Sequence, residues 1–237
     1  MQRIKYIGRE LALFIAHKMR DELIFNMAKL EGNTLTFAET QTVIHGISVA
    51  GKRMSELHQI EHIRDGWDEI IRQVESNRFG VDKDNFILIN SIVARGENPQ
   101  LGQFRTRPVS ISGTEYMPPL PMLLSDAFRN MSEHYHRTPG MERAFDLFLD
   151  TARNQYFADG NKRTGQLMMN GELMSRGYAP ITISPKNETR FHENLIGFYE
   201  SGEKPQMIDF LIECLNDPRY AVMQQAAEPE SDWDIDR

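Results

Sequence analysis

Apolar residues recur at three- and four-residue intervals along most of this chain, and this spacing constrains the fold more than any other feature. The clearest run lies in residues 55–77, where one helix face collects Leu57, Ile60, Ile63, Trp67, Ile70, Ile71 and Val74. Comparable spacing predicts further helices at residues 9–30, 36–46, 82–95, 121–135, 141–156, 161–176, 188–201 and 204–215. The sequence therefore predicts an all-α fold.

Local signals support the helix boundaries. Thr36 and Glu39 have the spacing of a capping box, in which each residue binds a backbone N–H at the start of a helix. Gly177 lies where a C-cap glycine is common, and Pro180 follows it. Residues 103–112 differ, because bulky and polar residues alternate there up to Gly113. We expect a short strand or a small β-hairpin in that segment.

Composition narrows the classes of function. The 237 residues carry a formal net charge of −7, which argues against electrostatic wrapping of a nucleic-acid backbone. The apolar run at residues 11–16 is far shorter than the roughly 20 residues of a membrane span. Cys214 is the only cysteine, so no internal disulfide forms. We expect no nucleic-acid partner, no membrane partner and a reducing, cytoplasmic setting.

The chain divides into three parts by pattern and composition. Residues 1–50 hold the N-terminal helices, and residues 51–217 hold a core with no linker that would split it. Residues 218–237 are rich in Gln, Ala and acids, which is typical of a disordered tail.

Residues 155–166 carry the most informative pattern. An apolar helix ends there, Asp159-Gly160-Asn161 forms a tight turn, and the next helix has Lys162 and Arg163 in its first turn. Cations are disfavoured at a helix N-terminus, so a bound anion would relieve the conflict. The free N–H groups and the two cations form a phosphate-sized cradle, beside which Asp159 could hold a divalent cation. An ordinary interhelical turn with exposed cations explains the pattern equally well.

The same segment resembles the signature of the Fic family, His-x-Phe-x-Asp/Glu-Gly-Asn-Gly/Lys-Arg with a second Arg three residues later. The matching positions are Phe157, Asp159, Gly160, Asn161, Lys162 and Arg163. Leu30-Glu31-Gly32-Asn33 resembles the inhibitory motif that some Fic proteins carry at the N-terminus. Residues 104–119 resemble the flap that aligns target peptides, with Phe104, Arg105, Val109 and Ile111.

Fic proteins are mostly helical and usually transfer AMP from ATP to a hydroxyl group of a target protein. The resemblance implies a Fic-type helical domain with a small β-hairpin flap, ATP as donor, Mg²⁺, and a protein partner offering a Tyr, Ser or Thr hydroxyl. Asp159 would hold Mg²⁺, Gly160 and Asn161 would line the phosphates, and Arg163 would neutralise them. Lys162 is the less common residue at its place. Assembly into a homo-oligomer is left open.

Two positions depart from the family pattern. The catalytic His falls on Gln155, and the second Arg, a γ-phosphate ligand, falls on Gln166. A general base contributes a factor of about 10²–10⁴, and a neutral amide cannot accept a proton near pH 7. We expect impaired transfer, by natural loss or by engineered inactivation, or a non-catalytic regulator that binds nucleotide or a partner. The second departure also predicts that Glu31 has lost its partner, unless Arg163 substitutes.

Two other patterns offer alternatives. His58, Glu61 and His62 fit His-x-x-Glu-His, which places two imidazoles one helical turn apart for zinc with Glu as base. No third ligand is identifiable, and a solvated helix face is the simpler interpretation. Phe191 lies on the helix beside the nucleotide base in the family, where it could stack on that base. Packing in the core is the favoured interpretation.

Overall fold

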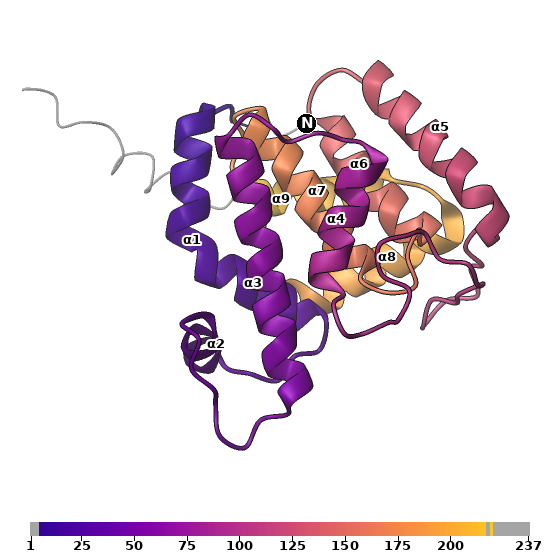
Figure 1. The fold of residues 1–237 in the computed structure, drawn as a ribbon. Helices are drawn as coiled ribbons and strands as arrows, with labels where there is room; N and C mark the ends of the chain where they lie inside the picture. The colour runs from indigo at the N-terminus through magenta and orange to yellow at the C-terminus, as the bar shows by residue number, and fades with distance from the viewer. Residues whose placement is uncertain (1–4, 217–218, 220–237) are drawn as a thin grey trace, which may run out of the picture.

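The computed structural model describes residues 5–216 and residue 219, and in this part of the chain it is built from helices without a β-strand (Figure 1). This confirms the all-α prediction. The predicted tail, residues 218–237, lies outside the described residues except for Arg219. The α-helices are α1 (Arg9–Leu30), α2 (Phe37–Ile44), α3 (Met54–Glu75), α4 (Lys83–Val93), α5 (Leu124–Arg137), α6 (Glu142–Asn154), α7 (Asn161–Ser175), α8 (Glu188–Ser201) and α9 (Pro205–Leu215); the 3₁₀ turns are η1 (Pro121–Leu123) and η2 (Pro185–Asn187).

Helix α7 is the central element. It packs against α1, α3, α4 and α6, and thirteen of its fifteen residues are buried. A helix enclosed on all sides needs small residues where neighbours approach closely, and Gly165 meets this need. A Cβ atom there would lie 3.1 Å from the backbone oxygen of Phe148 in α6. The start of α7 is therefore held rigidly, which matters because the predicted site lies there.

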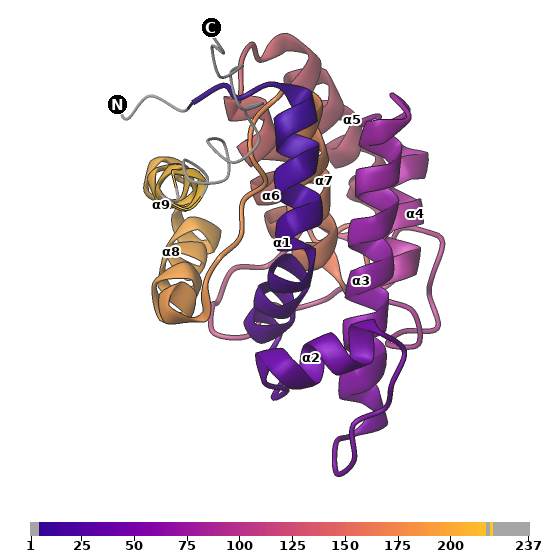
Figure 2. The same ribbon diagram turned by 90° about the vertical axis from the view of Figure 1, so that its left-hand side faces the viewer.

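The N-terminal helices cover one side of this core. Helix α1 runs beside α7 and α3, and α2 crosses near its C-terminal end (Figure 2). Thr36 and Glu39 form the predicted capping box at the start of α2. The packing of α1 brings its C-cap residue, Glu31, toward the N-terminus of α7. No described helix combines the length and apolar character needed to cross a membrane.

The predicted β-hairpin is absent from residues 103–112, which form an irregular segment with bends. The alternation has another cause. The Phe104 ring packs against Tyr156 and Phe157, and the Arg105 backbone N–H donates to the carbonyl of Tyr156. Side chains thus anchor the segment to the helical core, without the ladder of hydrogen bonds that a strand requires. We call residues 104–112 the flap.

Candidate functional site

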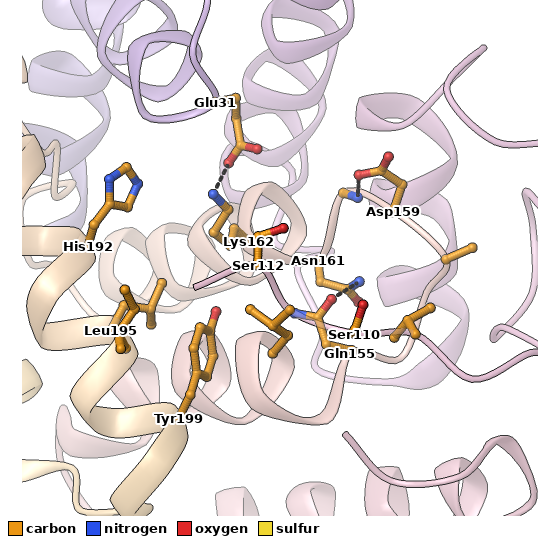
Figure 3. Close-up of a pocket in the computed structure, with 15 residues that line it drawn as sticks. Glu31, Ser110, Ser112, Gln155, Asp159, Asn161, Lys162, His192, Leu195 and Tyr199 are labelled. Atoms are coloured by element: carbon orange, nitrogen blue, oxygen red, sulfur yellow. Dashed lines mark hydrogen bonds and ion pairs between the residues drawn. The ribbon is translucent and has the colours of Figure 1, made fainter. Parts of the chain in front are cut away.

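A cavity of about 660 Å³ opens at the N-terminus of α7, within the size range of small-molecule sites (Figure 3). Four parts of the chain form its walls: the end of α1, the flap, the turn between α6 and α7, and one face of α8. The lining residues are Glu31, Val109, Ser110, Ile111, Ser112, Gln155, Ala158, Asp159, Gly160, Asn161, Lys162, His192, Leu195, Ile196 and Tyr199. Sequence positions more than 160 residues apart therefore meet in one site.

The turn between α6 and α7 has an unusual backbone at both ends. Gln155 ends α6 in the left-handed conformation, with φ 49° and ψ 59°. This conformation is costly for a residue with a side chain and often marks functional sites. Gly160 has φ 74°, and a Cβ atom there would lie 2.9 Å from the Cβ of Ala94. Only glycine satisfies both restrictions, so this position is fixed by geometry.

The side-chain amide of Gln155 is engaged at both ends. Its Nε2 donates to the carbonyl of Ala152 at 2.6 Å, and its Oε1 accepts from Asn161 Nδ2 at 3.0 Å. The carboxamide of Asn161 also donates to the Phe157 carbonyl and accepts from the Phe157 N–H. Asn161 therefore organises the turn, and Gln155 presents no base to the cavity.

The N-terminus of α7 fits an anion. The first-turn N–H groups of an α-helix have no intrahelical partners, and at the start of α7 no side chain caps them. The Asp159 carboxylate accepts from the Gly160 N–H at 2.6 Å, and its side chain is 51% exposed. An exposed carboxylate beside an anion site can bind a divalent cation that bridges to phosphate oxygens. The donor set of the turn therefore fits a nucleotide phosphate with a metal ion.

Lys162 is the charged partner of Glu31. Lys162 Nζ lies 3.3 Å from Glu31 Oε1, and Figure 3 shows the two side chains pointing toward each other at the cavity wall. The side chains are only 29% and 15% exposed, so water screens the pair weakly. The expectation that Glu31 has lost its partner is wrong. The cation comes from the first turn of α7, four residues before Gln166.

Arg163 is not among the residues that line the cavity, although its guanidinium lies 3.4 Å from the carboxylate of Asp159. Its guanidinium forms a two-pronged ion pair with Glu97, donates to the Val93 carbonyl at 2.6 Å, and is only 2% exposed. Burial by itself lowers the pKa of Arg163, but the bond to Glu97 and the nearby carboxylates outweigh it and raise that pKa. Arg163 thus ties α7 to the end of α4, and its role as a phosphate ligand stays a prediction.

The remaining motif residues have structural contacts. Gln166 is 5% exposed and faces the interior, outside the cavity lining. Asn33 donates to the Glu56 carbonyl and to Gln59, which fastens the chain after α1 to α3. His58 and His62 stack on one face of α3 with ring centroids 6.2 Å apart. Among the described residues, no group of three His, Cys, Asp or Glu side chains could hold a metal.

The flap is anchored to the helical core by Phe104 and Arg105, and four of its other residues line the cavity. Arg105 is 2% exposed and donates to the carbonyls of Gln155, Arg107 and Pro119. It therefore links the flap to the backbone of the α6–α7 turn. The residues that face the cavity are Val109, Ser110, Ile111 and Ser112. Val109 and Ile111 were predicted for the flap, whereas the two serines were not.

The fourth wall is one face of α8, the helix that the resemblance places beside the nucleotide base. His192, Leu195, Ile196 and Tyr199 lie at positions i, i+3, i+4 and i+7, the spacing of a single helix face. That spacing could have identified them. Phe191 is fully buried and stacks on Phe148, so the core interpretation is confirmed. Burial raises the pKa of Tyr199, and the charge of Glu31 raises it further. Tyr199 therefore stays a neutral hydroxyl.

Comparison with known proteins finds similarity to one family. The model of the Fic/DOC family matches residues 80–173, which include α4, the flap, α6 and nearly all of α7. Residues 80–173 therefore form a domain of the Fic/DOC family. Protein adenylyltransferase Fic of Drosophila melanogaster is 27% identical to the chain over 201 residues, which cover 81% of this chain and 39% of that protein. The same protein of Drosophila virilis is 26% identical.

Solved structures share the fold at low sequence identity. A Fic domain containing signaling protein from Bacteroides thetaiotaomicron matches with a TM-score of 0.77 and 19% identity, over 98% of this chain and 95% of that one. Fic-1 from C. elegans matches with a TM-score of 0.76 and 16% identity, over 91% and 67% of the two chains. The chain spans about two-fifths of the length of the curated relatives it matches.

Proposed function

We propose that this chain is a nucleotide-binding Fic protein of the protein adenylyltransferase type whose transfer step is impaired. The single observation that carries the proposal is the state of Gln155. Its amide occupies the place of the family's general base, and both of its ends are bonded within the turn. Such a group can orient an attacking hydroxyl but cannot take its proton.

The donor nucleotide in this proposal is ATP, and the metal is Mg²⁺ held by Asp159. Bound Mg²⁺ neutralises developing charge on the phosphate oxygens. The first-turn N–H groups of α7 would position the phosphates, with Gly160 allowing the turn that aims them. The acceptor would be a Tyr, Ser or Thr hydroxyl of another protein. Names of relatives support this assignment, since the proteins that match over 81% of the chain are called adenylyltransferases.

A second candidate function is a regulator that binds nucleotide or a partner without chemistry. The engagement of both cations near the turn favours it. Lys162 pairs with Glu31 and Arg163 pairs with Glu97, so neither is free to neutralise a phosphate. A site whose cations are already paired binds anions weakly, and the same pairs would stabilise a fixed shape for recognition by a partner.

Calorimetry with Mg²⁺ tests nucleotide binding directly. We expect ATP to bind with a Kd of about 1 mM, close to −4 kcal/mol, because the cations are paired. ADP should bind within about threefold of ATP, since Gln166 replaces a γ-phosphate ligand. Asp159→Asn should remove the dependence on Mg²⁺. No heat with either nucleotide at millimolar concentration, or a strong preference for ATP, would contradict the assigned cavity.

Glu31→Gln is expected to tighten ATP binding about three- to tenfold, roughly 1 kcal/mol. The substitution keeps the shape of the side chain but removes its charge, so Lys162 becomes available to a phosphate. Titration of ATP in parallel with Lys162→Met and the double variant measures the coupling. In the Lys162→Met background the gain should disappear. An equal gain in both backgrounds would mean that Glu31 repels the nucleotide directly, without acting through Lys162.

A further inference from the structure

A second cavity lies against the flap. It has a volume of about 330 Å³ and is lined by Asn98, Pro99, Gln100, Arg105, Arg107, Pro108, Val109 and Ala158. Val109 and Ala158 line the first cavity as well. The two spaces are therefore neighbours that share a wall, and a molecule resting on the flap at Val109 can reach both of them.

The charged residues that line this second cavity are all positive. Arg105 and Arg107 line it, and its lining residues include no carboxylate. The Arg105 guanidinium donates its hydrogen bonds to backbone carbonyls, which are neutral. Its positive charge is therefore not balanced by an acidic side chain among these partners. The Arg107 side chain is exposed and has no ion pair or hydrogen bond in the described part of the chain. Two uncompensated cations in a chain of net charge −7 form a local positive site.

A guanidinium group without a partner suits a carboxylate. Its planar donors match the two oxygens of Asp or Glu in a bidentate pair. We propose that the second cavity receives an acidic side chain of the acceptor protein, placed within a few residues of the hydroxyl that enters the first cavity. An extended peptide advances about 3.3 Å per residue, so neighbouring cavities accept side chains close in sequence. The inference rests on the proposed function and names its substrate class.

Fluorescence anisotropy with two labelled peptides tests the inference on the full chain. Both peptides carry one central Ser; one has Asp at the three positions on either side, and the other has Asn there. We expect the Asp peptide to bind at least about fivefold more tightly, equivalent to roughly 1 kcal/mol. The preference should shrink as salt is raised, because the contact is electrostatic and partly exposed.

Variants localise the contact. Arg107→Gln should reduce the preference to below about twofold, whereas Arg107→Lys should keep part of it, because the positive charge remains but the bidentate fork is lost. Arg78→Gln is the matched control, since Arg78 is an exposed arginine outside both cavities and has no ion pair with an acidic side chain among the described residues. It should retain the full preference, and melting temperatures of all variants verify folding.

Several outcomes would overturn the inference. Equal binding of the two peptides would do so, as would an equal loss of preference in Arg107→Gln and Arg78→Gln. A preference that appears only after removal of residues 218–237 would assign the cavity to the chain's own acidic segment. A preference that millimolar inorganic phosphate abolishes at constant ionic strength would assign it to a phosphate. ATP binding measured separately distinguishes these results from failure of the proposed nucleotide site.

Discussion

Gln155→His is expected to raise transfer of AMP from ATP to protein by a factor of about 10²–10⁴, the usual contribution of a general base. The backbone conformation at position 155 tolerates histidine. Position 155 has a left-handed conformation, in which His is several-fold enriched among non-glycine residues. An imidazole there has a titratable nitrogen near neutral pH, which the amide lacks. Radiolabelled ATP with the full chain, with and without the substitution, measures the effect.

In the reaction proposed for the Gln155→His variant, proton transfer is coupled to bond formation. The acceptor hydroxyl oxygen attacks the α-phosphorus of ATP, the bond to the bridging oxygen of pyrophosphate breaks, and the imidazole takes the hydroxyl proton. Gln155→Asn is the control, because Asn also tolerates the left-handed conformation but offers no base. It should leave transfer at the level of the unmodified chain. Adding Gln166→Arg to Gln155→His should raise transfer further by holding the γ-phosphate for in-line attack.

Rapid transfer by the unmodified chain would contradict the proposed impairment and require another base. His192 is then the residue to test, because it is the one imidazole among the residues that line the cavity. His192→Ala would abolish such activity if His192 served as base. No transfer by any variant, together with normal ATP binding, would instead favour the non-catalytic regulator.

Most of the fold follows from periodicity, because helices bury one face and the apolar residues record it. Periodicity is least informative for α7. This helix is buried on nearly all sides, so its boundaries came from turn residues and the family signature. The flap was predicted as a strand because bulky and polar residues alternate in it, whereas Phe104 packs on the core and residues 109–112 all line the cavity. Single-sequence patterns do not distinguish that arrangement from a strand in a ladder.

The sequence predicted where the candidate site lies, but it did not predict which side chains pair with one another there. The signature located the α6–α7 turn and the inhibitory motif located Glu31, and the structure brings both to one cavity. The ion-pair partners of Glu31 and Arg163 were not predictable from the sequence. Lys162 pairs with Glu31 and Arg163 with Glu97, and residue 97 lies far from both motifs in sequence. Ion pairs between distant elements depend on packing angles, which local sequence does not specify.

Arg105→Met is expected to lower the free energy of unfolding by about 3 kcal/mol, because a buried acceptor that loses its donor costs about 1–3 kcal/mol. The Arg105 guanidinium serves carbonyls in three separate segments: Gln155 in the α6–α7 turn, Arg107 in the flap, and Pro119 before α5. Methionine fills similar space but donates nothing. Lysine restores the charge without the planar fork, so Arg105→Lys should recover only part of the loss.

Urea titration followed by circular dichroism measures this difference, with Arg107→Met as the matched control. Arg107 is two residues away, exposed, and serves no carbonyl with its side chain, so its substitution should stay within about 0.5 kcal/mol. Because the carbonyl of Gln155 is one of the lost acceptors, Arg105→Met should also weaken ATP binding by releasing the turn. A stable Arg105→Met variant with unchanged ATP affinity would show that water replaces the guanidinium. It would also show that the turn is held by the Asn161 carboxamide and the Gly160 backbone without help from the flap.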